Sequence, residues 1–102
     1  MQEDEYEFGT PLDAEEAGVV SALSADEIEA IDAALLDATA PTWSKVAAVL
    51  SKQMKSRPSV PDDAPLEFYW SRLCGLVERG HLESQGNLRR ARFSEVRRPA
   101  AC

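Results

Sequence analysis

The feature that most limits how this chain can fold is an apolar stripe between residues 66 and 77. The stripe repeats at the three- and four-residue spacing of one helix face and consists of Leu66, Tyr69, Trp70, Leu73, Leu76 and Val77. This period predicts an amphipathic helix that packs through a broad face. Asp63 is placed to cap the helix, and Pro65 fits its first turn, where a missing N–H costs nothing. Gly80 suits the left-handed residue after a helix end, so we expect this helix to organise the core.

Two earlier segments predict helices that can cover this face. Residues 25–38 place Ile28, Ile31 and Leu35 on one face, and Ser24 and Glu27 have the spacing of a capping box at its start. Residues 42–57 carry a second stripe, which ends before Pro58 and consists of Trp43, Val46, Ala47, Leu50 and Met54. The three stripes together predict a helical core.

Strand and turn patterns follow the third helix. Gly86–Asn87 supplies turn chemistry between a short strand that begins at Leu82 and a returning strand over residues 93–98. The expected fold class is mainly α with a C-terminal β-hairpin, a three-helix winged-helix-like single domain. Residues 21–98 would form this domain, and residues 99–102 a tail.

Length and composition agree with one domain. A chain of 102 residues can bury a modest core without a disulfide or a metal ion. Hydrophobic residues make up 44% and charged residues 28%, which is close to globular averages. Cys74 and Cys102 lack any metal-ligand spacing and are expected to be reduced thiols, as in a cytoplasmic protein.

The N-terminus favours the same location. It is acidic where a secretory signal needs positive charge, and no apolar segment follows it. The longest apolar run, Val46–Leu50, is much shorter than the roughly 20 residues that span a bilayer. We therefore expect a cytoplasmic protein with no membrane partner.

Charge divides the chain into two unequal parts. Residues 1–44 hold 12 of the 18 acidic side chains and none of the 11 lysines and arginines, a formal charge of −12. Residues 45–102 hold the other six acids and all the bases, a formal charge of +5. The sequence therefore predicts an acidic surface that would attract a basic partner and a mildly basic body.

Residues 1–20 show no sustained apolar period, so we interpret them as a flexible acidic arm without a face to bury. Tyr6 and Phe8 alternate with Glu5 and Glu7 within it. Such acid-flanked aromatic residues form short linear binding motifs. The alternative is a solubilising tail that docks loosely on its own body.

Arginines are concentrated in the predicted hairpin. Residues 88–98 carry five arginines against one glutamate. They could contact a phosphate backbone, although the sequence pI near 4.6 and the two glutamates of the third helix oppose nucleic-acid binding. Alternatively they keep strand ends soluble, bind a protein or pair with the acidic arm. Arg72 and Arg79 are predicted to share the solvated face of the third helix. The candidate partner-binding residues are therefore Tyr6, Phe8, Arg72, Arg79, Arg89, Arg90 and Arg92.

The sequence nominates no reaction. It has one histidine, His81, and no nucleophile elbow, P-loop or dinucleotide-binding glycine pattern. Cys, His and carboxylate donors do not recur at the spacing of a zinc site. We expect a protein that is not an enzyme and that binds no cofactor and no metal.

Three motifs resemble a small bacterial family of domains of unknown function. They are W-x-K-V-A from Trp43, R-L-x-x-L-V-x-x-G-x-L-E from Arg72 and S-E-V-R from Ser94, and the resemblance covers roughly residues 24–98. It implies no activity. Its apolar positions, Trp43 among them, are expected in the core. Its polar positions are expected to join the hairpin to the third helix by ion pairs, and they are Arg72, Arg79, Glu83, Glu95 and Arg97.

Two functions follow as hypotheses. The first is a non-catalytic bacterial protein-interaction module, for instance an immunity or regulatory protein that binds a basic partner through the acidic block. The alternative is a winged-helix nucleic-acid-binding transcriptional regulator that uses the third helix and the arginine-rich hairpin.

Overall fold

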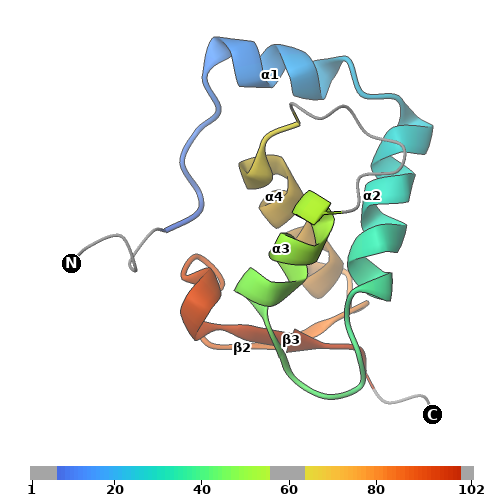
Figure 1. Ribbon diagram of the computed structural model, residues 1–102, viewed down its shortest axis with the longest axis vertical. Coiled ribbons are helices and arrows are strands. Elements are labelled where there is room, and N and C mark those ends of the chain that lie inside the picture. The colour runs from blue at the N-terminus through green and yellow to red at the C-terminus, as the bar shows by residue number, and fades with distance from the viewer. Residues whose placement is uncertain (1–6, 56–63, 100–102) are drawn as a thin grey trace.

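The computed structural model describes residues 7–55 and 64–99 (Figure 1). This part of the chain is mainly helical and has a small antiparallel sheet. Its elements are helix α1 (Ala14–Ser21), helix α2 (Ala25–Asp37), strand β1 (Ser44–Lys45), helix α3 (Val46–Lys55), helix α4 (Leu66–Glu78), strand β2 (Glu83–Gln85), the 3-10 turn η2 (Ala91–Phe93) and strand β3 (Glu95–Arg97). No helix of the described residues combines the length and the apolar character needed to cross a bilayer.

Helix α4 carries the predicted apolar stripe and lies at the centre of the core. Tyr69, Leu73 and Leu76 are fully buried, and α4 contacts both α2 and α3 (Figure 1). Gly80 has the predicted positive φ of 83° after the helix end. The helix begins at Leu66 after Pro65, with no side-chain cap, and the expected cap at Asp63 lies outside the described residues.

Helix α2 begins as its capping box predicts. The Ser24 hydroxyl accepts a hydrogen bond from the Glu27 amide at 3.0 Å, and the Glu27 carboxylate accepts one from the Ser24 amide at 2.8 Å. These bonds satisfy amide groups that the first turn of a helix leaves unpaired. Ile31 and Leu35 are buried on its inner face, as their spacing indicates.

Helix α3 begins at Val46, later than its stripe predicted. Ser44 and Lys45 form strand β1 instead, and they pair with Val96 and Glu95 of β3. Trp43 is therefore not on the helix face, and it is half-buried outside the hydrophobic core. The interpretation of Trp43 as a core residue of the second helix is wrong, because strand pairing determines the backbone there. The predicted end of this helix lies outside the described residues.

The predicted hairpin is confirmed and belongs to a sheet with strand order β1-β3-β2. Its return strand is shorter than predicted, because the amide of Phe93 and the hydroxyl of Ser94 both donate to the Arg90 carbonyl and hold residues 90–94 in a turn. Gly86 has a φ of 84°, and a Cβ there would lie 2.7 Å from the Phe93 carbonyl oxygen. Glycine is therefore required at the start of this loop.

The N-terminal residues are more ordered than the sequence indicated. Asp13 and Glu16 form a capping box that starts α1, with hydrogen bonds of 2.8 and 3.1 Å. Helix α1 has no buried residue, yet Phe8, which precedes it, is only 4% exposed. The interpretation of residues 1–20 as an arm with no face to bury is therefore wrong at Phe8, and it missed α1.

Candidate protein-interaction surfaces

Arg72 and Arg79 both contact Asp32 of α2, and Arg79 is exposed as predicted whereas Arg72 is half-buried. Arg72 makes a two-point contact, with Nε 2.9 Å from Oδ1 and Nη2 2.6 Å from Oδ2 of Asp32. Nη2 of Arg79 lies 3.6 Å from the same Oδ2. The hydrogen bond to Asp32 raises the pKa of Arg72, against the opposite effect of burial. These arginines therefore join α4 to α2, not to the hairpin as expected.

The outer face of α4 is consequently poor in positive charge. Ser71 and Glu78 are exposed on it, and Glu67 and Cys74 are half-buried. Burial and the nearby Glu78 carboxylate raise the pKa of the Cys74 thiol to about 11. Cys74 is therefore a protonated, uncharged thiol near neutral pH. The face formed by Glu67, Ser71, Cys74 and Glu78 has no positive charge, so it offers little attraction to a phosphate backbone.

The other polar motif residues join one strand to another. Nε of Arg97 on β3 lies 2.6 Å from Oε1 of Glu83, its partner on β2. The guanidinium of Arg97 also stands 4.3 Å from the centre of the Trp43 ring. Glu95 accepts a hydrogen bond of 2.5 Å from Gln85 across the same strand pair. These contacts stabilise the sheet and replace the expected link between the hairpin and α4.

The arginine-rich loop between β2 and β3 contacts the N-terminal segment. Nε of Arg89 donates a hydrogen bond of 3.0 Å to the Phe8 carbonyl oxygen, and the Arg89 carbonyl accepts one of 2.8 Å from the Phe8 amide. Arg90 is half-buried with its guanidinium 5.1 Å from the centre of the Phe93 ring, and Arg92 is exposed. Phe8 and Arg89 thus meet, whereas Tyr6 lies outside the described residues.

Phe93 forms an apolar patch on the same loop that the sequence analysis did not single out. It is 56% exposed, and within residues 7–55 and 64–99 it is the large apolar side chain that remains open to solvent. The sequence places Phe93 in a predicted strand, and this position did not indicate an exposed ring. The exposure of the ring depends on how the turn at residues 91–93 directs the side chain. An exposed aromatic residue beside arginines is typical of the centre of protein interfaces.

Phe8 also packs on α4. Its ring stacks on Trp70 with 5.6 Å between ring centres and 12° between the planes. The indole N–H of Trp70 donates a hydrogen bond of 2.8 Å to the Leu88 carbonyl, and the Gly9 amide donates one of 2.9 Å to the Glu67 carboxylate. The segment of Phe8 and Gly9 therefore lies between α4 and the loop that precedes η2, and it forms contacts with both.

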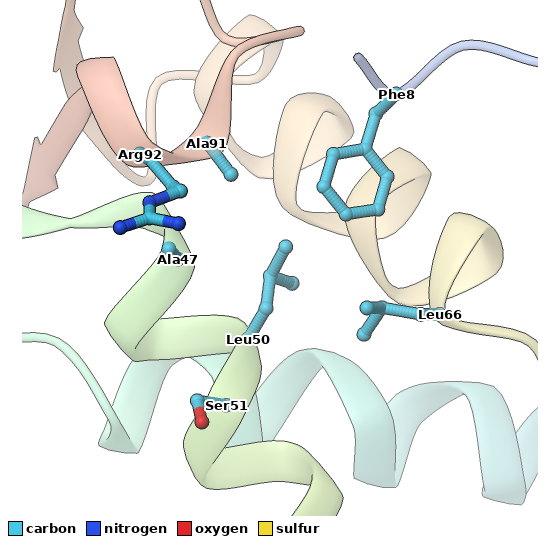
Figure 2. A pocket seen from close by; sticks show the side chains of 7 residues that line it. All are labelled: Phe8, Ala47, Leu50, Ser51, Leu66, Ala91 and Arg92. Atoms are coloured by element: carbon cyan, nitrogen blue, oxygen red, sulfur yellow. The ribbon is translucent and has the colours of Figure 1, made fainter. Parts of the chain in front are cut away.

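A pocket of about 270 Å³ opens beside Phe8 (Figure 2). Figure 2 shows Phe8, Leu50 and Leu66 directed toward the same space, from three different parts of the chain. Its lining is mostly apolar, with one charged member, and consists of Phe8, Ala47, Leu50, Ser51, Leu66, Ala91 and Arg92. Such a pocket has room for an apolar side chain rather than for a large cofactor.

Helices α1 and α2 carry exposed acidic side chains. Asp26, Glu29 and Asp37 are exposed along one face of α2, and Glu15 is exposed on α1. Within the described residues, none of these four carboxylates forms an ion pair. The structure therefore presents part of the predicted acidic block to solvent on α1 and α2.

Comparisons with protein-family models, with curated proteins and with solved structures give no match. In the part of the chain that the structure describes, no three His, Cys, Asp or Glu side chains gather into a group that could hold a metal ion.

Proposed function

We propose that this chain is a non-catalytic bacterial protein-interaction module of the cytoplasm, of the immunity or regulatory type, whose acidic face binds a basic partner. The observation that carries this proposal is the set of exposed carboxylates on α2, together with the exposed Glu15 on α1, none of which forms an ion pair within the described residues. No lysine or arginine precedes residue 45, so α1 and α2 themselves contribute acidic side chains and no basic ones.

The geometry of α2 suits such a role. Asp26, Glu29 and Asp37 lie three and eight residues apart, and with a rise of 1.5 Å per residue they cover roughly 16 Å of one helix face. Carboxylates in this arrangement steer a basic surface during its approach and raise the association rate at low salt. A nucleic-acid-directed toxin is a protein with the required basic surface.

A winged-helix nucleic-acid-binding regulator is the second candidate, and the topology favours it. A strand precedes α3 and pairs with the last strand, so the order of elements and the sheet order β1-β3-β2 agree with a winged-helix arrangement. The loop with Arg90, Arg92 and Phe93 would be the wing. The outer face of α4 argues against duplex recognition, because Glu78 is exposed there while Arg72 and Arg79 contact Asp32.

A capture experiment with two matched variants separates these functions. The first variant neutralises the acidic face by Asp26→Asn, Glu29→Gln and Asp37→Asn, and the second neutralises the loop by Arg90→Gln and Arg92→Gln. Each immobilised full-length protein is exposed to host lysate with and without nuclease treatment, and the retained proteins are compared with those on the unmodified chain.

We expect a basic protein that the unmodified chain and the loop variant retain and that the acidic-face variant loses. Its retention should weaken as salt rises, because exposed charges are screened. Equal retention by the acidic-face variant would refute the proposal. Binding that disappears with nuclease or with the loop variant would instead support the regulator.

A further inference from the structure

The segment at Phe8 and Gly9 is held in the way a bound peptide is held. The backbone of Phe8 exchanges hydrogen bonds with Arg89 through both its amide and its carbonyl, and the Gly9 amide is bound by the Glu67 carboxylate. The Phe8 ring enters the apolar interior on one side of Trp70. Main-chain hydrogen bonds together with one buried side chain are the usual means by which proteins hold extended peptides.

The chain around this anchor buries no other side chain completely. Glu7, Thr10 and Pro11 are exposed, and α1 buries no residue. The next buried side chain after Phe8 is Leu23. Withdrawal of Phe8 would therefore free residues 7–22 without uncovering a second buried side chain of that segment.

The groove has more space than the segment at Phe8 fills. The pocket of about 270 Å³ lies directly beside the Phe8 ring, and Leu50 and Leu66 point into it (Figure 2). Arg89 and Arg92 stand at the groove, whereas the sequence around Phe8 contains Glu3, Asp4, Glu5 and Glu7. The side chains of the groove are thus complementary to an aromatic residue with carboxylates on its N-terminal side.

We propose that this groove, between Trp70 and the Arg89 loop, is a docking site for an extended segment of a partner protein that carries an aromatic residue flanked by carboxylates. The chain's own Phe8 segment occupies the site and competes with the partner. This surface is separate from the acidic face of α2, so the inference does not depend on the function proposed above. A tethered segment is present at a high effective concentration, and it lowers the apparent affinity of any free competitor.

The test measures binding of a fluorescent peptide of residues 3–12 to full-length proteins by anisotropy. Phe8→Ala removes the anchor of the tethered segment and should bind the peptide at least tenfold more tightly than the unmodified chain does. Ser84→Ala is the control, since it changes an exposed side chain on β2 that does not line the pocket, and it should bind like the unmodified chain. The peptide with alanine in place of its phenylalanine should bind at least tenfold more weakly to the Phe8→Ala protein.

A second variant releases the segment without substituting a buried side chain. Gly9 has a φ of 106° and donates its amide to Glu67, and proline permits neither. Gly9→Pro should therefore also bind the peptide at least tenfold more tightly than the unmodified chain. In a further peptide, only the acidic residues, the phenylalanine and the glycine of residues 3–12 are kept, and the other residues are replaced. The affinity of this peptide for the Phe8→Ala protein should stay within about tenfold of the affinity of the unaltered peptide.

Two results would overturn the proposal. One is that neither Phe8→Ala nor Gly9→Pro binds the peptide more tightly than the unmodified chain, while circular dichroism shows helical proteins. The other is that the unmodified chain sediments as a dimer and Phe8→Ala as a monomer, because the occupant of the groove would then be the arm of a second copy.

Discussion

The contact of Arg72 with Asp32 predicts a measurable coupling between α4 and α2. We expect a double-mutant cycle of Asp32→Ala and Arg72→Met to give a coupling free energy of about 1–2 kcal/mol in favour of the native pair. Methionine keeps most of the apolar stem of arginine, so the cycle reports chiefly on the charged group.

The magnitude follows from the exposure of the two side chains. Two unit charges 4 Å apart interact by about 1 kcal/mol in water and by about 4 kcal/mol at an effective dielectric constant of about 20. The side chains of Arg72 and Asp32 are 28% and 19% exposed, so their surroundings resemble the second case more than the first. The cost of removing both from water and of fixing them in place offsets a large part of this attraction.

The pair of Arg97 with Glu83 is an internal control. It has the same shortest distance of 2.6 Å, but its side chains are 40% and 46% exposed. The same cycle there should give about 0–1 kcal/mol. Both cycles are measured by urea unfolding followed by circular dichroism at 25 °C. Equal couplings, or a value below about 0.5 kcal/mol for Asp32 and Arg72, would refute the argument that burial strengthens the first pair.

Five further outcomes are expected. Leu73→Ala should lower the free energy of unfolding by about 2–5 kcal/mol in urea, since Leu73 is 0% exposed; a loss below about 1 kcal/mol would contradict its place in the core. Phe8→Ala should lower it by about 1.5–3 kcal/mol, the value for burying such a side chain, and no loss would show that the segment is not docked. Cys74, with its pKa raised to about 11, should react with iodoacetamide slowly at pH 8 and faster up to about pH 11; a rate that levels off near pH 9 would contradict the raised pKa. The same shift means that stability falls as pH rises from about 9, where the unfolded thiol ionises, toward 11. The intact chain should bind duplex DNA more weakly than about 1 µM at physiological salt, and tighter binding would favour the regulator.

The elements that could be predicted from the sequence are those whose causes are local. The capping box of α2 lies within a single helical turn, and the apolar stripe of α4 repeats from one turn to the next. Both are confirmed. The capping box of α1 was also readable from the spacing of Asp13 and Glu16, but the weak apolar pattern of this segment hid the helix. Local hydrogen bonding outweighed apolar periodicity there.

The errors concern contacts between distant parts of the chain. Trp43 has a helical spacing to Val46, but the backbone before Val46 pairs with β3 near the other end of the domain. Phe8 has a charged neighbour before it, and its burial depends on Trp70. The partner of Arg72 could not be chosen from sequence, because Asp32 becomes its neighbour only when α2 and α4 pack together. Periodicity identifies a face but not the side chain that will meet it.

The central place of β3 in the sheet has a consequence for biosynthesis. β1 and β2 each pair with β3 and not with each other, and Val96 of β3 is completely buried. A ribosome makes β3 after every helix of the domain, so a growing chain that ends before residue 95 has two strands with no partner. The helices can begin to pack during translation, whereas the sheet forms only when its last strand has been synthesised.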